Sequence, residues 1–185
     1  FNNFDESNLN LKLQQTSNDT YLKTYKMKSP IIKDTSTLKS SLEINAYRED
    51  LSFNADFQVY ENLAIEKTSD RYEFIYPSYD LFKQINNNTN LDGNFSLNSS
   101  GYAKHYNTNI FEKVIINDFV FNSNSKFLNN GLKNNYNFLI KNTNSDAINS
   151  EKYSNSMNHS FASIFEFNSS YPLIKKDKLY KNILK

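Results

Sequence analysis

The sequence predicts an all-β protein, folded as an antiparallel up-and-down meander. Apolar and polar side chains alternate along most of the chain, which is the period of a strand whose two faces meet different surroundings. Aromatic residues make up 15 % of the chain, a share too high for a disordered protein. Polar, turn-forming segments separate the alternating ones at short intervals, as in sheets built from sequential strands.

The longest alternating segment is Asn109–Asn122, which contains no Gly or Pro and is rich in β-branched and aromatic residues. One face carries Phe111, Ile115, Phe119 and Phe121, interrupted by Lys113 and Asn117. Fully extended, its roughly 14 residues would span about 45 Å. Ordinary soluble strands have about 5–6 residues. We therefore expect a sheet taller than that of a small sandwich, and a wall crossing a membrane is one candidate.

About eight further strands, one short helix and several turns complete the predicted meander, which forms a single domain over residues 1–185. Pro77 is expected to stop one strand, which resumes at Tyr79, because proline lacks the N–H that a ladder needs. A polar, mobile loop is expected over Thr143–Asn155, and a turn over Ser123–Gly131. The other strands are expected at Asn8–Gln15, Leu38–Asn45, Leu51–Tyr60, Arg71–Tyr76, Tyr79–Ile85, Asn94–Tyr102, Leu132–Asn142, Met157–Ser169 and Tyr171–Lys175, and the helix from Asn18 or Asp19 to Lys26.

Composition excludes several classes of protein. The 21 basic and 20 acidic residues are nearly balanced, so no nucleic-acid partner is indicated. Without Cys the segment has no disulfide, thiolate metal site or thiol chemistry. No run of about 20 apolar residues exists for a transmembrane helix, which leaves the closed barrel as the other way to span a membrane. Because the sequence runs from Phe1 to Lys185 without an initiator Met or signal peptide, we expect it to be an internal fragment of a longer chain.

No catalytic, metal-binding or cofactor-binding constellation is found in the sequence. The two histidines, His105 and His159, stand 54 positions apart and are interpreted as structural or surface residues. HExxH, GxSxG, P-loop and GxGxxG motifs are all missing, and three glycines cannot form a phosphate-binding loop. Neighbouring carboxylates such as Asp70 and Glu73 are interpreted as solvated groups at strand ends. We therefore expect neither an enzyme nor a cofactor.

The tyrosines favour a membrane barrel over a soluble sandwich, although both remain open on pattern alone. In outer-membrane barrels an apolar face looks toward lipid, and aromatic girdles mark the two interfaces. The tyrosines expected near strand ends are Tyr60, Tyr72, Tyr76, Tyr79, Tyr102, Tyr106, Tyr136, Tyr153 and Tyr171.

Several segments resemble the barrel domain of the lipopolysaccharide-assembly outer-membrane protein family LptD, in its alphaproteobacterial form. They are Thr16–Ile32 (TSNDTYLKTYKMKSPII), Ser69–Pro77 (SDRYEFIYP), Asn134–Asn142 (NNYNFLIKN) and Phe167–Lys175 (FNSSYPLIK), and their order and spacing carry the resemblance. The residues that match the family's motifs are Ser17, Asn18, Asp19, Tyr21, Asp70, Arg71, Tyr72, Pro77, Ser169, Ser170, Pro172 and Leu173.

The resemblance implies a large outer-membrane barrel that inserts lipopolysaccharide into the outer leaflet through a seam between its first and last strands. It also implies a plug lipoprotein as partner, and a periplasmic jelly-roll domain, absent from these residues, that receives lipopolysaccharide from a protein bridge. The family's bridging cysteines have no counterpart here. The alternatives are a porin or receptor barrel for small solutes and a soluble cell-surface β-sandwich that binds a ligand.

Overall fold

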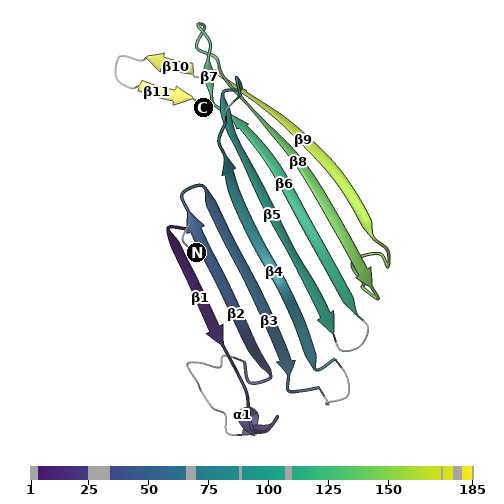
Figure 1. Ribbon diagram of the computed structural model, residues 1–185. Helices are drawn as coiled ribbons and strands as arrows, with labels where there is room; N and C mark the ends of the chain where they lie inside the picture. Colours follow the sequence, from purple (N-terminus) through teal and green to yellow (C-terminus); the bar gives the residue numbers. More distant parts are fainter. Residues whose placement is uncertain are drawn as a thin grey trace.

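The computed structural model describes residues 4–24, 34–65, 70–87, 89–106, 110–171, 173–176 and 181–184. Its elements are almost all strands (Figure 1). They are β1 (Glu6–Lys12), α1 (Tyr21–Thr24), β2 (Thr37–Arg48), β3 (Leu51–Asn62), β4 (Tyr72–Ile85), β5 (Gly93–Tyr106), β6 (Phe111–Ser123), β7 (Lys126–Phe127), β8 (Lys133–Ile148), β9 (Asn158–Ser170), β10 (Leu173–Lys176) and β11 (Lys181–Leu184). Among these described residues, no helix is long and apolar enough to cross a membrane.

Nine strands form one antiparallel sheet in nearly sequential order, which confirms the predicted meander. The order is β1-β2-β3-β4-β5-β6-β8-β7, and β9 pairs with β8. β10 and β11 form a separate two-stranded sheet. Figure 1 shows the large sheet as a curved, open layer with β1 and β9 at its two sides. Within the described residues it is a single wall, not closed into a barrel.

The strands of this sheet are long, as the sequence predicted for the segment at Asn109–Asn122. That strand is β6 and has 13 residues, while β4 and β5 have 14 each and β8 has 16. At about 3.3 Å per residue these strands extend for roughly 40–50 Å. β6 and β8 contain no Gly or Pro, either of which weakens or interrupts a ladder, whereas β4 keeps its length through Pro77 and β5 through Gly101.

The register sorts side chains onto two chemically different faces. In one row, Leu11, Leu42 and Phe57 are direct partners, and in another Leu97, Phe119 and Ile140 are. We call the face carrying these rows the apolar face. The opposite face, here the polar face, carries polar rows such as Asn54, Asp80 and Ser100, or Asn98, Asp118 and Lys141. It also carries apolar residues such as the partners Val120, Leu139 and Ile164.

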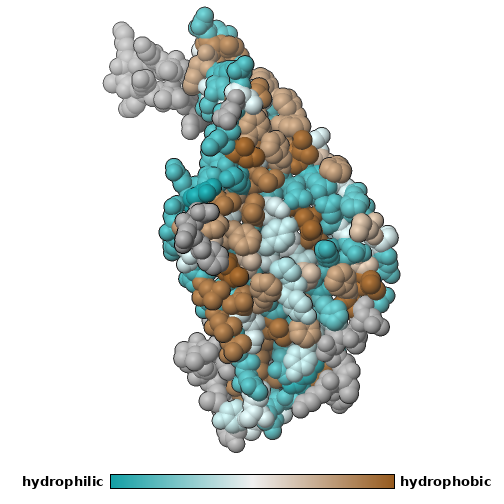
Figure 2. Space-filling model, viewed as in Figure 1, coloured by the Kyte–Doolittle hydropathy of each residue, from teal (hydrophilic) through white to brown (hydrophobic). Residues whose placement is uncertain are grey.

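Much of the apolar face is uncovered. Leu9 is 64 % exposed, Phe161 76 % and Phe165 65 %. Figure 2 shows hydrophobic surface over β1–β3 and again over the upper ends of β8 and β9, with more hydrophilic surface between them. The buried apolar cluster of the described residues is small and consists of Leu22, Leu38 and Leu63. The sheet therefore presents apolar side chains that no second layer of described residues covers.

Three local expectations about where strands end differ from the structure. Pro77 does not end its strand: β4 continues from Tyr72 to Ile85, and the register shifts between Ile75 and Ser78, where a bulge accommodates the residue that cannot donate. Thr143–Ile148, expected as part of a loop, extends β8, because its backbone pairs in register with β6. The expected turn at Ser123–Gly131 contains the short strand β7.

The predicted helix is one turn, α1, and residues 25 and 26 lie outside the described part of the chain. Within the turn at Ser123–Gly131, the Asn-Gly pair behaves as expected, since Gly131 has a φ of 86°. The long β6 begins at Phe111, two residues later than predicted, and ends one residue later, at Ser123.

Candidate functional site

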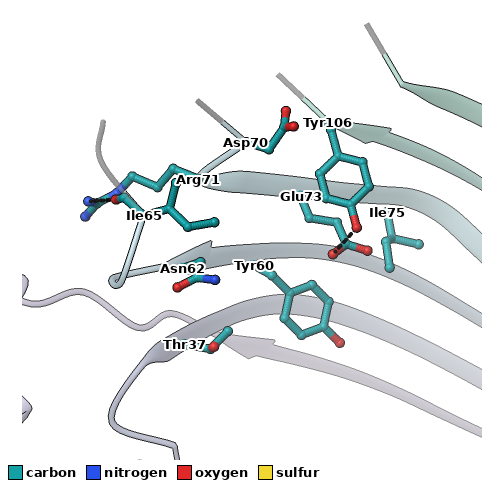
Figure 3. A pocket seen from close by; sticks show the side chains of 9 residues that line it. All are labelled: Thr37, Tyr60, Asn62, Ile65, Asp70, Arg71, Glu73, Ile75 and Tyr106. Atoms are coloured by element: carbon teal, nitrogen blue, oxygen red, sulfur yellow. Dashed lines mark hydrogen bonds between the residues drawn. The ribbon is translucent and has the colours of Figure 1, made fainter. Parts of the chain in front are cut away.

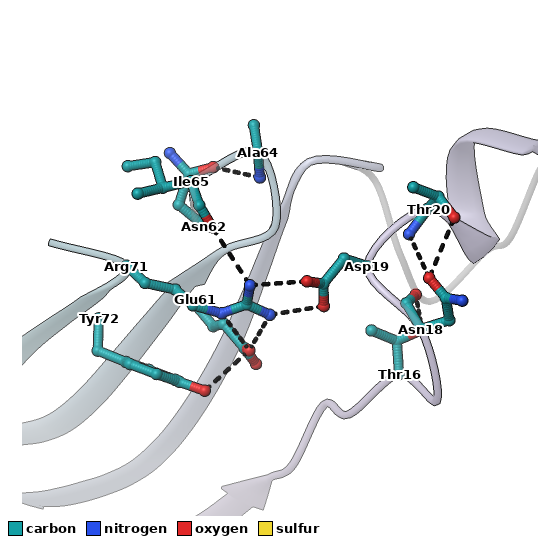
Figure 4. A network of polar contacts seen from close by, with 10 residues as sticks. All are labelled: Thr16, Asn18, Asp19, Thr20, Glu61, Asn62, Ala64, Ile65, Arg71 and Tyr72. Carbon is teal, nitrogen blue, oxygen red and sulfur yellow. Dashed lines mark hydrogen bonds and ion pairs between the residues drawn. The ribbon is translucent and has the colours of Figure 1, made fainter. Parts of the chain in front are cut away.

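The most connected polar group of the described residues is Arg71, which lies immediately before β4. Its guanidinium makes a paired contact with Asp19, with Nη1 donating to Oδ2 at 2.8 Å and Nη2 to Oδ1 at 2.7 Å. Nε and Nη2 also donate to Oε1 of Glu61, at 2.9 and 2.6 Å. A further bond from Nη1 reaches the carbonyl of Ile65 at 3.3 Å. Figure 4 shows the guanidinium between the two carboxylates.

This Arg71 cluster joins segments far apart in the sequence. Asp19 belongs to the connection between β1 and β2, whereas Glu61 lies near the end of β3. Within that connection the Oδ1 of Asn18 accepts a bond from the N–H of Thr20 at 3.0 Å, and the carbonyl of Asn18 accepts one from the N–H of Tyr21 at 3.1 Å. These local bonds shape the turn, and the ion pair to Arg71 then ties the turn to the end of the sheet.

The electrostatics of the cluster favour the charged form of Arg71. The side chain of Arg71 is only 3 % exposed, and hydrogen bonding to Asp19 and then to Glu61 raises the pKa of its guanidinium above the ordinary value. Tyr72 contributes a further donor, because its hydroxyl bonds Oε1 of Glu61 at 2.9 Å. A buried guanidinium with all these bonds holds two segments of the chain together and is not a reactive group.

A hollow of about 490 Å³ lies beside the cluster. Its lining residues, shown in Figure 3, are Thr37, Tyr60, Asn62, Ile65, Asp70, Arg71, Glu73, Ile75 and Tyr106. Within it both carboxylate oxygens of Glu73 are engaged: Tyr106 donates to Oε2 at 3.0 Å, and Lys104 forms an ion pair with Oε1 at 2.8 Å. The hollow offers hydroxyl, amide and carboxylate groups on the polar face, but no nucleophile activated by a neighbouring base.

The structure brings together some of the motif residues that the sequence singled out. Asp19, Arg71 and Tyr72 meet in the Arg71 cluster, Asn18 and Tyr21 shape the adjoining turn, and Asp70 lines the hollow. Ser17 lies in the same connection, without a role in these contacts. Pro77 lies at the bulge of β4, after a cis peptide bond with Tyr76.

The remaining motif residues lie elsewhere. Ser169 and Ser170 are at the end of β9, and the hydroxyl of Ser169 donates to Oδ1 of Asn134 at 2.7 Å. Register places them at the opposite end of the sheet from Arg71, because Ser170 pairs with Lys133 at the start of β8. Leu173 begins β10 and pairs with Leu184, while Pro172 lies outside the described residues.

Aromatic rings gather on the apolar face near both ends of the strands. One cluster joins Phe95, Phe119, Phe121, Tyr136 and Phe165, with successive ring centroids 4.6–6.4 Å apart. The other joins Tyr72, Phe74, Tyr76 and His105, at 5.7–6.3 Å. Along β5 the clusters are ten residues apart, about 33 Å of extended chain.

The expectation for individual tyrosines holds only in part. Tyr72 and Tyr106 stand at strand ends, but Tyr79 lies in the middle of β4, because that strand passes through Pro77. His105 belongs to the second aromatic cluster, whereas His159 stands on the edge strand β9, bonded to Asn144.

Glu61 is a functional partner that sequence reasoning missed. It lies one residue beyond the strand expected at Leu51–Tyr60, and only the pairing of β3 with β4, in which it faces Tyr72, brings it next to Arg71. Among the described residues no group of three or more His, Cys, Asp or Glu side chains is placed to hold a metal ion. No family model matches the chain, and no curated protein is significantly similar to it in sequence.

Proposed function

We propose that the chain forms part of the wall of an outer-membrane β-barrel, in the translocon that inserts lipopolysaccharide into the outer leaflet of a Gram-negative bacterium. The membrane part of the proposal is carried by one observation. A nine-stranded antiparallel sheet of long strands has an uncovered apolar face and a polar face. This is the pattern of strands with lipid on one side and a wet lumen on the other.

The two aromatic clusters agree with this reading. Their separation of about 33 Å along β5 corresponds to roughly 25 Å of height when a strand is tilted by about 40°. An outer-membrane barrel has an apolar band of about 25 Å between its aromatic girdles. The clusters would then lie near the two interfaces, and the Arg71 cluster would lie beyond one of them, where charge is not in contact with hydrocarbon.

The choice of lipopolysaccharide as cargo rests on the sequence resemblance to LptD. Under this proposal the partners are lipopolysaccharide, a plug lipoprotein in the lumen, and the periplasmic transport bridge that contacts the jelly-roll domain. The Asn- and Ser-rich polar face would let a sugar headgroup pass without holding it tightly, because single neutral hydrogen bonds contribute only about 0.5–1.5 kcal/mol net.

The first test is fractionation of the full-length protein, with gel migration of unboiled and boiled samples. We expect it in the outer membrane, with faster migration before boiling and a small lipoprotein co-purifying. An outer-membrane barrel without that lipoprotein would favour a porin or receptor. A soluble protein with no heat-dependent migration would overturn the membrane proposal and favour a cell-surface sandwich.

The cargo is tested by making the lumen apolar. Asn98→Leu combined with Ser100→Leu, both on the polar face of β5, should reduce surface lipopolysaccharide while the heat-dependent migration persists. The matched control keeps polarity at the same positions with Asn98→Ser and Ser100→Asn. Unchanged surface lipopolysaccharide in the leucine variant would contradict the export role.

A further inference from the structure

A row of hydrogen-bonded polar side chains crosses the apolar face. Tyr79 OH and Ser99 Oγ lie 3.2 Å apart, Ser99 Oγ donates to Oδ1 of Asn117 at 2.7 Å, and Asn117 Nδ2 donates to Oδ1 of Asn142 at 3.2 Å. Asn144 Nδ2 donates to the same Oδ1 of Asn142 at 2.6 Å. The row therefore runs without interruption from β4 to β8.

The row ends at the edge strand β9. Nδ1 of His159 lies 2.6 Å from Oδ1 of Asn144. Because that amide oxygen can only accept, this hydrogen bond requires the proton on Nδ1, and in that tautomer Nε2 is an acceptor. The row fixes Asn144 and His159 from within the sheet, since every amide in it already has a partner on the neighbouring strand.

A hollow of about 200 Å³ lies at this end of the row. It is lined by Lys113, Ile115, Asn144, Asp146, Met157 and His159, together with Ser145. Lys113 on β6 and Asp146 on β8 are direct partners in the register, yet among the described residues neither forms an ion pair. A positive and a negative group thus stand side by side in the lining of the hollow.

Large exposed apolar side chains lie next to this hollow on the same face. Phe161 directly faces Asn142 across β8 and β9 and is 76 % exposed, and Phe165 farther along β9 is 65 % exposed. Ile140 lies one row from Asn142 and is 37 % exposed. Any molecule that fills the hollow and covers these side chains must have a polar, charged end and a long apolar part.

We propose that this end of the row binds a zwitterionic phospholipid whose headgroup carries a phosphate and a primary ammonium, as phosphoethanolamine does. The phosphate would bind Lys113, the ammonium would bind Asp146 and accepting groups such as Nε2 of His159, and an acyl chain would lie along Phe161 and Phe165. Side-by-side opposite charges complement a zwitterion better than an anion, because an anion alone would face Asp146 without compensation. The inference rests on the proposed membrane location of the apolar face, and it adds a lipid site outside the lumen.

The test uses the full-length protein, reconstituted in bilayers of phosphoethanolamine or phosphoglycerol lipid, released into detergent and weighed intact by native mass spectrometry. The unvaried protein should retain the phosphoethanolamine lipid in preference. Lys113→Gln should weaken retention of both lipids, by about fivefold, the order expected for one lost exposed charge pair. Asp146→Asn should abolish the preference between the two lipids while phosphoglycerol retention persists.

The matched control is Lys126→Gln in β7, an exposed lysine at the other end of the sheet, which should change neither retention nor preference. Heat-dependent migration of each variant shows whether its barrel has folded. If the membrane proposal is wrong, the protein without substitutions already lacks this migration, and that result is obtained before any lipids are compared. With a folded barrel, an unaltered lipid preference in Asp146→Asn, or equal retention of both lipids by the unvaried protein, would overturn the inference.

Discussion

Replacing Arg71 with Met is the sharpest test of how the β1–β2 connection is held to the sheet. The substitution keeps side-chain length and removes a guanidinium that is 3 % exposed. The carboxylates of Asp19 and Glu61 then lose their main partner; in the structure these side chains are 35 % and 22 % exposed. Breaking a fully buried pair costs about 3–5 kcal/mol, and exposed pairs contribute at most about 1 kcal/mol.

Because water can reach both carboxylates in the variant, we expect a loss between these two limits, about 2–3 kcal/mol. The measurement is urea unfolding of the reconstituted full-length protein, followed by heat-dependent migration. Arg48→Gln is the control, because Arg48 forms an exposed ion pair with Asp50, its side chain being 38 % exposed. A loss in Arg71→Met no larger than in this control would refute the reasoning.

A local measurement distinguishes loss of the contact between Asp19 and Arg71 from general destabilisation of the sheet. Asp19→Asn removes one charge from the cluster but leaves Glu61 bonded to Arg71, so the sheet end should stay intact while the connection loosens. We expect faster tryptic cleavage after Lys23 in α1, at a urea midpoint only slightly changed. Cleavage at the unvaried rate would show that Asp19 does not hold the connection.

Three further predictions concern backbone contact, the polar row and pH. A Cβ at Gly101 would lie 2.7 Å from the carbonyl oxygen of Val114, so Gly101→Ala should cost about 1–3 kcal/mol in urea unfolding, and an undiminished midpoint would contradict the close strand contact. Asn117→Leu leaves Asn142 without its donor from β6 and should cost about 1–2 kcal/mol, whereas also replacing its partners in the row with apolar residues should recover part of that loss. Hydrogen bonds from Arg48 and then Lys83 lower the pKa of Asp50, so its contribution to stability is present above the unfolded pKa of about 3.9 and is lost as pH falls below it. Asp50→Asn should therefore flatten the acid side of the stability profile, and an unchanged acid side would contradict this.

Local pattern was sufficient for the strands but not for their limits. The strands expected at Leu38–Asn45 and Leu51–Tyr60 follow from alternation on both sides of a short polar break, and the structure pairs them as β2 and β3. The continuation of β4 through Pro77 could not be predicted, because a bulge depends on the neighbouring strands. Thr143–Ile148 looked like a loop because its residues are polar, yet backbone pairing with β6 does not require apolar side chains.

The candidate sites, too, could be predicted only in part from the sequence. The sequence drew attention to Asp19 and Arg71 separately, as parts of two motifs about 50 residues apart, and gave no sign that Glu61 would complete their cluster. Asn117 was noted as an interruption of an apolar face, but its partners Asn142 and Ser99 lie on other strands. Their meeting depends on register, in which a shift of one residue would move every side chain to the opposite face.

The sequence by itself determined the fold class of this protein. Alternation with few glycines and prolines leaves long antiparallel strands as the main way to separate apolar from polar side chains. Tertiary structure decided which residues become neighbours. The ion pairs of Arg71, the polar row across the apolar face and the adjacent charges of Lys113 and Asp146 all join segments that are separate in the sequence. Such contacts arise only when strand order and register are set, since neither is written in the period of any single strand.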